Sequence, residues 1–293
     1  MHFNLGYDDI GQNYEETIIL IGGLGTQRTV WPDNFCEELL KNKYRVIRFD
    51  NRDIGESSFY KSISDSELSK LVSKSINGES FTPPYSLLDM ANDTLALINK
   101  LELIKVHVVG MSMGGRIGHI IAKLENKNIK SLTSIMSTSG APYLPSGIKV
   151  AIDSLMKKPK DEFNIDEIID ISLMQQKIIG SPSYPISEEY IKQIVKVNYL
   201  RGHNPKGIIR QWLASVSEGD QSNILSKIDI PALIIHGQND PLIPYQCGLD
   251  IAEKIKNSKF VLIEGMGHNI PPLLSELLAE KLLIFYDEIK NLK

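Results

Sequence analysis

One serine lies in a sequence pattern that suits a nucleophile. Ser112 is the centre of Gly110-Met111-Ser112-Met113-Gly114, which matches the pattern G-x-S-x-G. The apolar stretch before it, Lys105 to Val109, is predicted to be a strand, and Arg116 to Leu124 after it has helical spacing. A serine between a strand and a helix, flanked by glycines, sits on a tight turn that exposes its hydroxyl. The pattern therefore predicts that Ser112 is a nucleophile.

A serine hydroxyl needs a base, and the base needs an acid that orients it. His268 is the candidate base, because it lies in a glycine-rich loop after the predicted strand Phe260 to Ile263. Asp240 is the candidate acid, in an Asn-Asp-Pro turn after the predicted strand Ala232 to His236. Both loops are expected at the carboxyl edge of a sheet, where open α/β sheets place their sites. The sequence thus predicts a catalytic triad of Ser112, Asp240 and His268.

Acyl transfer also requires backbone amides that bind an oxyanion. The amide of Met113, directly after the nucleophile, is one candidate donor. The loop Gly22-Gly23-Leu24-Gly25 follows an early strand, and the Leu24 amide is the second candidate. This loop matches neither the P-loop pattern nor G-x-G-x-x-G, which argues against phosphate binding.

Strand-like and helix-like segments alternate through most of the chain. The alternation predicts an α/β fold with a mostly parallel sheet covered by helices on both faces. Besides the segments above, the predicted strands are Thr17 to Ile21, Arg45 to Phe49 and Ser131 to Met136, and the predicted helices are Trp31 to Leu40, Leu87 to Leu101, Gln246 to Ile255 and Leu273 to Ile289.

Two stretches interrupt the alternation. Residues Phe59 to Tyr85 are polar and are predicted to be rich in loops. Residues 141–227 are helical in pattern and lack a clear core strand, which predicts a helical cap inserted between late strands of a core formed by residues 1–140 and 228–293. We expect the cap and the nucleophile turn to supply the substrate-binding side chains, and the candidates are Met111, Tyr143, Met174 and Trp212.

Composition limits the classes of function. The chain has 293 residues, a formal net charge of −4 and no block of basic residues, which argues against nucleic-acid binding. The N-terminal residues Met1 to Gly6 do not resemble a secretory signal, and no apolar run is long enough to span a membrane. Cys36 and Cys247 are far apart, and the histidines show no metal-ligand spacing. We expect a cytoplasmic monomer or homodimer that uses no metal or cofactor.

Four motifs in order resemble the α/β-hydrolase superfamily over nearly the whole chain. They are the Ser112 turn, the stretch Asp50 to Ser57, the acid loop Ile235 to Pro244 and the histidine loop Ile263 to His268. Gly22-Gly23, Trp31-Pro32, Arg48 to Asp53 and Gly180-Ser181-Pro182 resemble the aclacinomycin methylesterase-like group. The candidate oxyanion loop departs from the superfamily pattern, because the common motif His-Gly-x-Gly is replaced here by Gly22-Gly23-Leu24-Gly25. The resemblance implies an ester hydrolase in which Asp50 and Arg52 hold the turn beside this loop.

The favoured hypothesis is a carboxylesterase that cleaves a small or medium apolar ester through an acyl-enzyme. The same triad also serves lactone hydrolysis, carbon–carbon bond hydrolysis and cofactor-free peroxide chemistry. A dehalogenase or an epoxide hydrolase is disfavoured, because both need an aspartate in place of Ser112. The sequence is also compatible with a non-catalytic ligand receptor on the same fold and with a protein-binding role of the stretch Phe59 to Tyr85.

Overall fold

The computed structural model describes residues 3–124 and 127–291. Met1 and His2, which belong to the stretch Met1 to Gly6 considered above, and residues 292–293, at the end of the predicted core, lie outside the described residues. The described strands form one sheet in the order β1-β3-β2-β4-β5-β6-β7, in which only β1 is antiparallel to its neighbour. The strands are β1 (Tyr7–Ile10), β2 (Glu16–Ile21), β3 (Arg45–Phe49), β4 (Lys105–Met111), β5 (Ile129–Ile135), β6 (Ala232–Gly237) and β7 (Ser258–Ile263).

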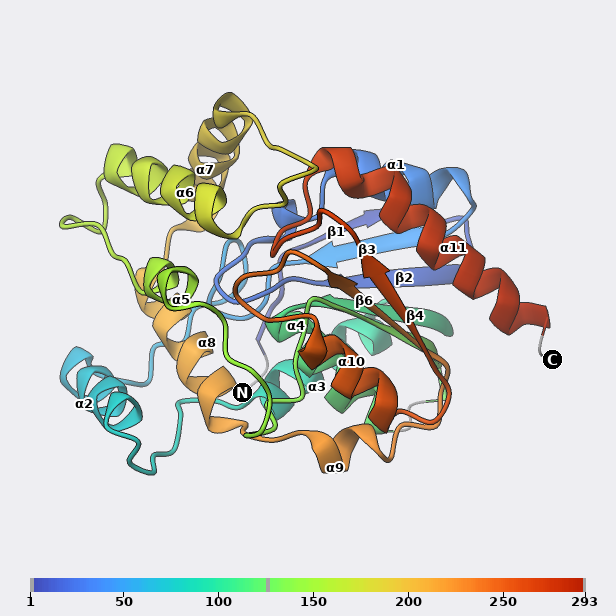
Figure 1. Cartoon of the computed structure of the whole chain (residues 1–293), viewed down its shortest axis with the longest axis horizontal. Helices are drawn as coiled ribbons and strands as arrows, with labels where there is room; N and C mark the ends of the chain where they lie inside the picture. The colour runs from blue at the N-terminus through green and yellow to red at the C-terminus, as the bar shows by residue number, and fades with distance from the viewer. Residues whose placement is uncertain (1–2, 125–126, 292–293) are drawn as a thin grey trace.

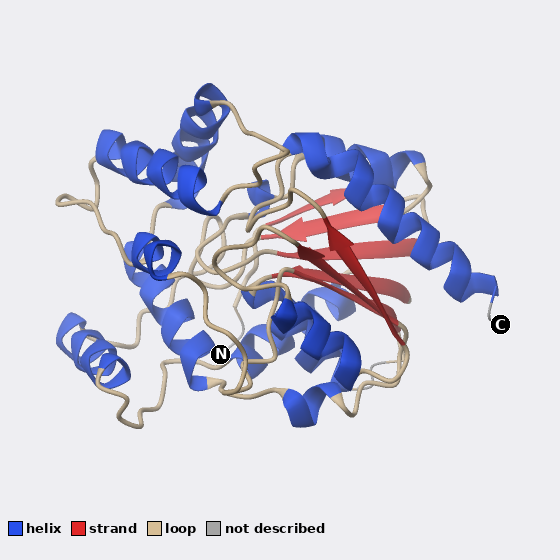
Figure 2. Cartoon of the chain, in the orientation of Figure 1, coloured by secondary structure: helices blue, strands red, loops and turns tan. Residues whose placement is uncertain are grey.

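Helices cover both faces of the sheet (Figures 1 and 2). Side chains alternate along β2, so that Ile19 and Ile21 join one apolar core cluster and Ile18 and Leu20 join the other. The first cluster includes side chains of α3 (Leu87–Lys100), α4 (Met113–Lys123) and α10 (Gln246–Lys254), and the second those of α1 (Asp33–Lys41) and α11 (Ser275–Asn291). The central strands are therefore apolar on both faces, as a parallel sheet requires.

A run of helices between β5 and β6 lies beyond one end of the sheet (Figure 1). It consists of α5 (Lys149–Leu155), α6 (Ile165–Ile179), α7 (Glu188–Gly202) and α8 (Pro205–Ser217). The short helix α9 (Ser222–Leu225), which follows them, packs against α4 and α10 of the core instead. We call residues 141–227 the helical insertion. It faces the end of the sheet from which the loops after β4, β6 and β7 emerge.

The α/β fold class predicted from the sequence is confirmed. The predicted strands and helices are all present, although several boundaries differ. The helix predicted from Arg116 begins at Met113, directly after the candidate nucleophile, and the final helix is preceded by a 3₁₀ turn, Pro272–Leu274. Among the described helices, none is long and apolar enough to cross a membrane.

Among the described elements, the 3₁₀ turn Arg28–Val30, one helix and one strand have no counterpart in the elements predicted from the sequence. The stretch Phe59 to Tyr85, predicted to be rich in loops, contains α2 (Asp65–Ile76). The Ser64 hydroxyl accepts a hydrogen bond from the Glu67 amide, and the Glu67 side chain accepts one from the Ser64 amide, which forms a capping box. The strand without a counterpart is the edge strand β1, whose Asp8 and Asp9 conceal its apolar pattern.

Candidate active site

Ser112 lies on the sharp turn between β4 and α4. Its backbone has φ 53° and ψ −119°, a conformation that residues other than glycine rarely adopt. The two flanking glycines are required by close backbone contacts. A Cβ on Gly110 would lie 2.1 Å from the carbonyl oxygen of Gly114, and a Cβ on Gly114 would lie 2.2 Å from the carbonyl oxygen of Ile21. The turn thus holds a strained serine whose side chain is only half-buried.

His268 joins Ser112 to Asp240. Its Nε2 lies 3.1 Å from Oγ of Ser112, and its Nδ1 lies 2.7 Å from Oδ2 of Asp240. The carboxylate can only accept a hydrogen bond, so Nδ1 carries the proton and Nε2 is free to accept the one from the serine hydroxyl. The three predicted side chains therefore form one continuous hydrogen-bonded chain.

The surroundings of Asp240 keep its carboxylate ionised. Burial opposes ionisation, but the electrostatic interaction with His268 and the hydrogen bonds from His236, His268 and the Ile243 amide outweigh it, so the pKa of Asp240 lies well below its ordinary value. The amides of Leu242 and Ile243 both donate to Oδ1 at 2.9 Å. An ionised acid beside Nδ1 stabilises a positive imidazolium.

The candidate oxyanion donors belong to two segments next to Ser112. Met113 is the first residue of α4, and Leu24 belongs to the loop after β2. A Cβ on Gly23, next to Leu24, would lie 3.9 Å from Oγ of Ser112, which places this loop beside the hydroxyl. Within the described residues, neither the Leu24 nor the Met113 amide donates to a protein acceptor. Both amides thus remain available to a bound oxygen.

The predicted substrate-binding residues have different surroundings. Met111 is 4% exposed and packs in the core cluster that contacts α1 and α11. Tyr143 is 67% exposed, and its hydroxyl donates to Asp250 of α10. No described hydrogen bond joins it to a triad residue. Met174 on α6 and Trp212 on α8 are half-buried in the helical insertion. A role of these four side chains in substrate binding stays a prediction.

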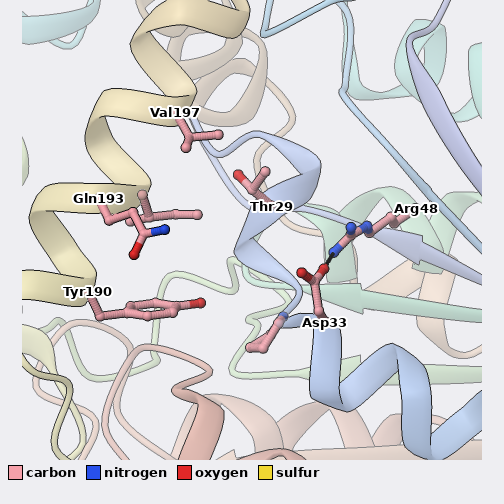
Figure 3. Close-up of a pocket in the computed structure, with 8 residues that line it drawn as sticks. Thr29, Asp33, Arg48, Tyr190, Gln193 and Val197 are labelled. Atoms are coloured by element: carbon pink, nitrogen blue, oxygen red, sulfur yellow. Dashed lines mark ion pairs between the residues drawn. The ribbon is translucent and has the colours of Figure 1, made fainter.

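A cavity of about 240 Å³ separates the helical insertion from the core beside α1. Figure 3 shows Tyr190, Gln193 and Val197 of α7 on one side, facing Thr29, Asp33 and Arg48 on the other. Arg48 is ion-paired with Asp33 at 2.7 Å. No triad residue lines this cavity.

A second cavity, of about 260 Å³, lies beside the histidine loop and is lined by Gln176, Ser181 and Asn269 among others.

The Asp50 to Asp53 turn connects the core to the helical insertion. The buried Asp50 carboxylate accepts hydrogen bonds from Arg28 and from Arg201 of α7. The buried Asp53 carboxylate accepts two hydrogen bonds from Arg210 of α8, at 2.8 and 2.9 Å.

The turn also contacts the candidate oxyanion loop, because Asn51 donates to the carbonyl oxygen of Gly22. Asp50, whose carboxylate also accepts a hydrogen bond from the Glu56 amide, therefore holds the turn beside this loop, as the sequence suggested. Arg52 pairs with Asp93 instead and stacks on Phe3.

Three further polar side chains contact the site loops, and no motif in the sequence predicts a role for them. Gln211 of α8 accepts a hydrogen bond from the Gly25 amide, while Ser181 and Asn269 hydrogen-bond to each other beside His268. No spacing in the sequence relates these residues, although Ser181 belongs to the Gly180-Ser181-Pro182 motif.

A family model described as the alpha/beta hydrolase fold matches residues 16–272. This protein belongs to the alpha/beta hydrolase fold family. The family resemblance inferred from the four motifs is therefore confirmed.

Curated relatives support the narrower resemblance as well. Rhodomycin D methylesterases of Streptomyces sp. (strain C5) and Streptomyces peucetius are 26% and 25% identical to this alpha/beta hydrolase. In both cases the match covers 93% of this chain and 91% of the relative. A bifunctional esterase/perhydrolase of Acinetobacter calcoaceticus is 26% identical over 67% of this chain and 72% of its own length.

Solved structures share the fold. An esterase from Thermogutta terrifontis superposes with a TM-score of 0.70 at 21% identity, covering 98% of this chain and 94% of its own. An enol-lactonase from Burkholderia xenovorans LB400 superposes with a TM-score of 0.68 at 18% identity, covering 97% of this chain and 96% of its own.

Within the part of the chain that the structure describes, no group of three or more His, Cys, Asp or Glu side chains is arranged to hold a metal ion.

Proposed function

We propose that this alpha/beta hydrolase is a carboxylesterase in which Ser112, His268 and Asp240 form the catalytic triad. The observation that carries the proposal is the hydrogen-bonded chain from Oγ of Ser112 through the His268 ring to the Asp240 carboxylate, at 3.1 and 2.7 Å. The strained serine turn and the ionised, buried Asp240 give further support.

The reaction follows from this geometry. Oγ of Ser112 attacks the ester carbonyl carbon while Nε2 of His268 takes the hydroxyl proton. The amides of Leu24 and Met113 bind the oxyanion, an effect worth about 3 kcal/mol per donor in related chemistry. The alcohol leaves with the proton from His268, and an acyl-serine remains. Water, deprotonated by His268, then releases the acid and restores the serine.

The helical insertion is the proposed cap, and its apolar side chains would surround an apolar part of the substrate. Because the two Streptomyces relatives are methylesterases, methyl esters are the first substrates to test. Relatives named for perhydrolase chemistry and for hydrolysis of a 2-hydroxy-6-oxo dienedioate keep peroxide and carbon–carbon bond chemistry open on the same triad. The cytoplasmic location and the monomeric or dimeric state stay predictions.

The deciding experiment is labelling with a fluorophosphonate, followed by intact-mass analysis. We expect a single adduct on the wild type and none on Ser112→Ala. Ser187→Ala is the matched control, because Ser187 caps α7 and has no contact with the triad. Methyl and p-nitrophenyl esters of acetate, butyrate and octanoate then measure the preferred acyl length.

The outcomes separate the hypotheses. Loss of both the adduct and ester turnover in Ser112→Ala, with turnover retained in Ser187→Ala, supports the esterase. A folded wild type that forms no adduct and hydrolyses none of the esters contradicts it and favours the ligand receptor. A labelled enzyme that hydrolyses only lactones or carbon–carbon substrates keeps the triad and changes the reaction.

A further inference from the structure

The loop that carries His268 is bound to the helical insertion on both sides of the histidine. The His268 amide donates to the carbonyl oxygen of Ile179 at 2.7 Å, where α6 ends. The preceding amide, of Gly267, donates to the Ser181 hydroxyl at 2.9 Å. The imidazole of His268 therefore projects from a backbone whose position is set by residues of the insertion.

The residue after the histidine completes this attachment. Oδ1 of Asn269 accepts hydrogen bonds from the hydroxyl and the amide of Ser181, at 2.5 and 3.0 Å. The Ser181 hydroxyl thus accepts from one neighbour of His268 and donates to the other. It is 4% exposed, so water does not readily replace these bonds. A Cβ on Gly267 would lie 2.4 Å from the carbonyl oxygen of Gly180, which shows how closely the two segments approach.

A second side chain of the insertion, Gln211, binds the loop that carries the candidate oxyanion donor Leu24. Oε1 of Gln211, on α8, accepts a hydrogen bond from the Gly25 amide at 2.9 Å, one residue after the Leu24 amide. Its Nε2 donates to the carbonyl oxygen of Arg52 at 2.8 Å. Gln211 is fully buried, so it connects the oxyanion loop to the Asp50 to Asp53 turn without competition from solvent.

We propose that Ser181 and Gln211 are positioning residues through which the helical insertion sets the geometry of the base and of the oxyanion loop. The inference rests on the proposed function. In this arrangement the insertion is a fixed part of the catalytic apparatus, and its α6–α7 connection does not swing away during turnover. A displacement of about 1 Å at a reacting group costs up to about 100-fold in rate.

The two residues have distinct expected effects. Ser181→Ala releases the His268 loop, so it lowers kcat by about 10- to 100-fold with little change in KM. Because the base is displaced from Asp240, the acid limb of the kcat/KM profile also shifts. Gln211→Met loosens the oxyanion loop, so kcat falls and inhibition by a phenylboronic acid weakens to a similar extent. The acid limb stays unchanged in this variant.

The experiment compares these variants with the wild type, with the conservative Ser181→Thr and with two matched controls. The controls are Ser187→Ala, at the residue that caps α7, and Gln193→Met, on α7 itself. No described hydrogen bond joins either side chain to the His268 loop or to the oxyanion loop. The measurements are kcat, KM, the pH profile, the rate of fluorophosphonate labelling and the melting temperature. We expect the controls to retain wild-type kinetics and Ser181→Thr to recover most of the lost kcat.

Three results would overturn the proposal. One is a kcat within about threefold of the controls in both Ser181→Ala and Gln211→Met. Another is a loss of activity that follows only the fraction of folded enzyme, with an unchanged pH profile and boronate affinity. The third is a wild type that fluorophosphonate does not label, in which case the proposed function fails and this inference fails with it. The first two occur on a labelled wild type and leave the esterase proposal intact.

Discussion

Nδ1 of His268 and Oδ2 of Asp240 lie 2.7 Å apart, in a pair whose side chains are almost fully enclosed. The two residues are separated by 28 positions in the chain. They meet because β6 and β7 are parallel neighbours with Gly237 opposite Ile263, so the loops after both strands emerge at the same edge of the sheet. This pair is the relationship on which the proposed base depends.

Asp240→Asn is expected to abolish most of the activity while preserving the fold. An asparagine of the same shape presents an amide to Nδ1, which favours the wrong imidazole tautomer and removes the charge that stabilises the imidazolium. The expected loss in kcat is about 10⁴-fold, as for the equivalent change in serine proteases. Steady-state hydrolysis of a p-nitrophenyl ester measures it.

Asp229→Asn is the control, because Asp229 is exposed in the loop before β6. Retention of wild-type kcat by Asp240→Asn would contradict the assigned acid.

Gly114→Ala is expected to disrupt the nucleophile turn through a steric clash. The new Cβ would lie 2.2 Å from the carbonyl oxygen of Ile21, a backbone atom that cannot rotate away. The melting temperature and the fluorophosphonate labelling rate should therefore both fall.

The control for Gly114→Ala is Gly78→Ala, at a glycine with positive φ but nothing within 4 Å of the added Cβ. It should cost about 1 kcal/mol or less and leave labelling unchanged. Equal losses in the two variants would mean that the contact with β2 is unimportant.

Arg210→Met is expected to destabilise the protein strongly, because it leaves the fully buried Asp53 carboxylate with fewer partners. Removing one member of a buried ion pair costs about 3–5 kcal/mol. Lys206→Met, on the same helix, breaks an exposed pair with Asp65 and should cost less than about 1 kcal/mol.

Urea unfolding at pH 7 gives the free energy of unfolding of both variants. If the two values agreed, the Asp53–Arg210 pair would not anchor α8. In the double variant Arg210→Met, Asp53→Asn, part of the lost stability should return, since no unpaired charge remains.

His119 is expected to make the protein sensitive to mild acid. Burial, together with the charge of Arg116, lowers the pKa of His119 from 6.5 to about 4, although a hydrogen bond with Gln221 opposes the shift. The unfolded chain therefore binds a proton between pH 6.5 and 4 that the folded protein does not. Stability is fully present above pH 6.5 and decreases as the pH falls towards 4, by about 3 kcal/mol for this shift.

Urea unfolding from pH 7 to pH 4.5 tests this effect. His119→Gln should have a lower free energy of unfolding at pH 7 and a smaller decrease with falling pH than the wild type. A His119→Gln variant with the full wild-type slope would assign the acid sensitivity to other groups.

Several elements of this structure can be predicted from short stretches of sequence. The strand, the Gly-x-Ser-x-Gly turn and the following helix lie within about twenty residues, so local chemistry is enough to predict Ser112 as the candidate nucleophile. The helix α2 also had a local signal, the capping box of Ser64 and Glu67, which the sequence analysis overlooked. The strand β1 lacked such a signal, because its Asp8 and Asp9 are held by ion pairs with residues distant in the chain: Asp8 with Arg28 and Arg48, and Asp9 with Arg45.

The sequence by itself determined the alternation of strands and helices, the order of Ser112, Asp240 and His268, and the place of the helical insertion. These features follow from local apolar periodicity and from turn residues. Only the tertiary structure decided which insertion side chains hold the site. Gln211 meets Gly25 across 186 positions, Arg210 meets Asp53 across 157 and Ser181 meets Asn269 across 88. The physical reason is that a buried polar side chain must find a partner wherever packing places one, and no periodicity records a contact between distant segments.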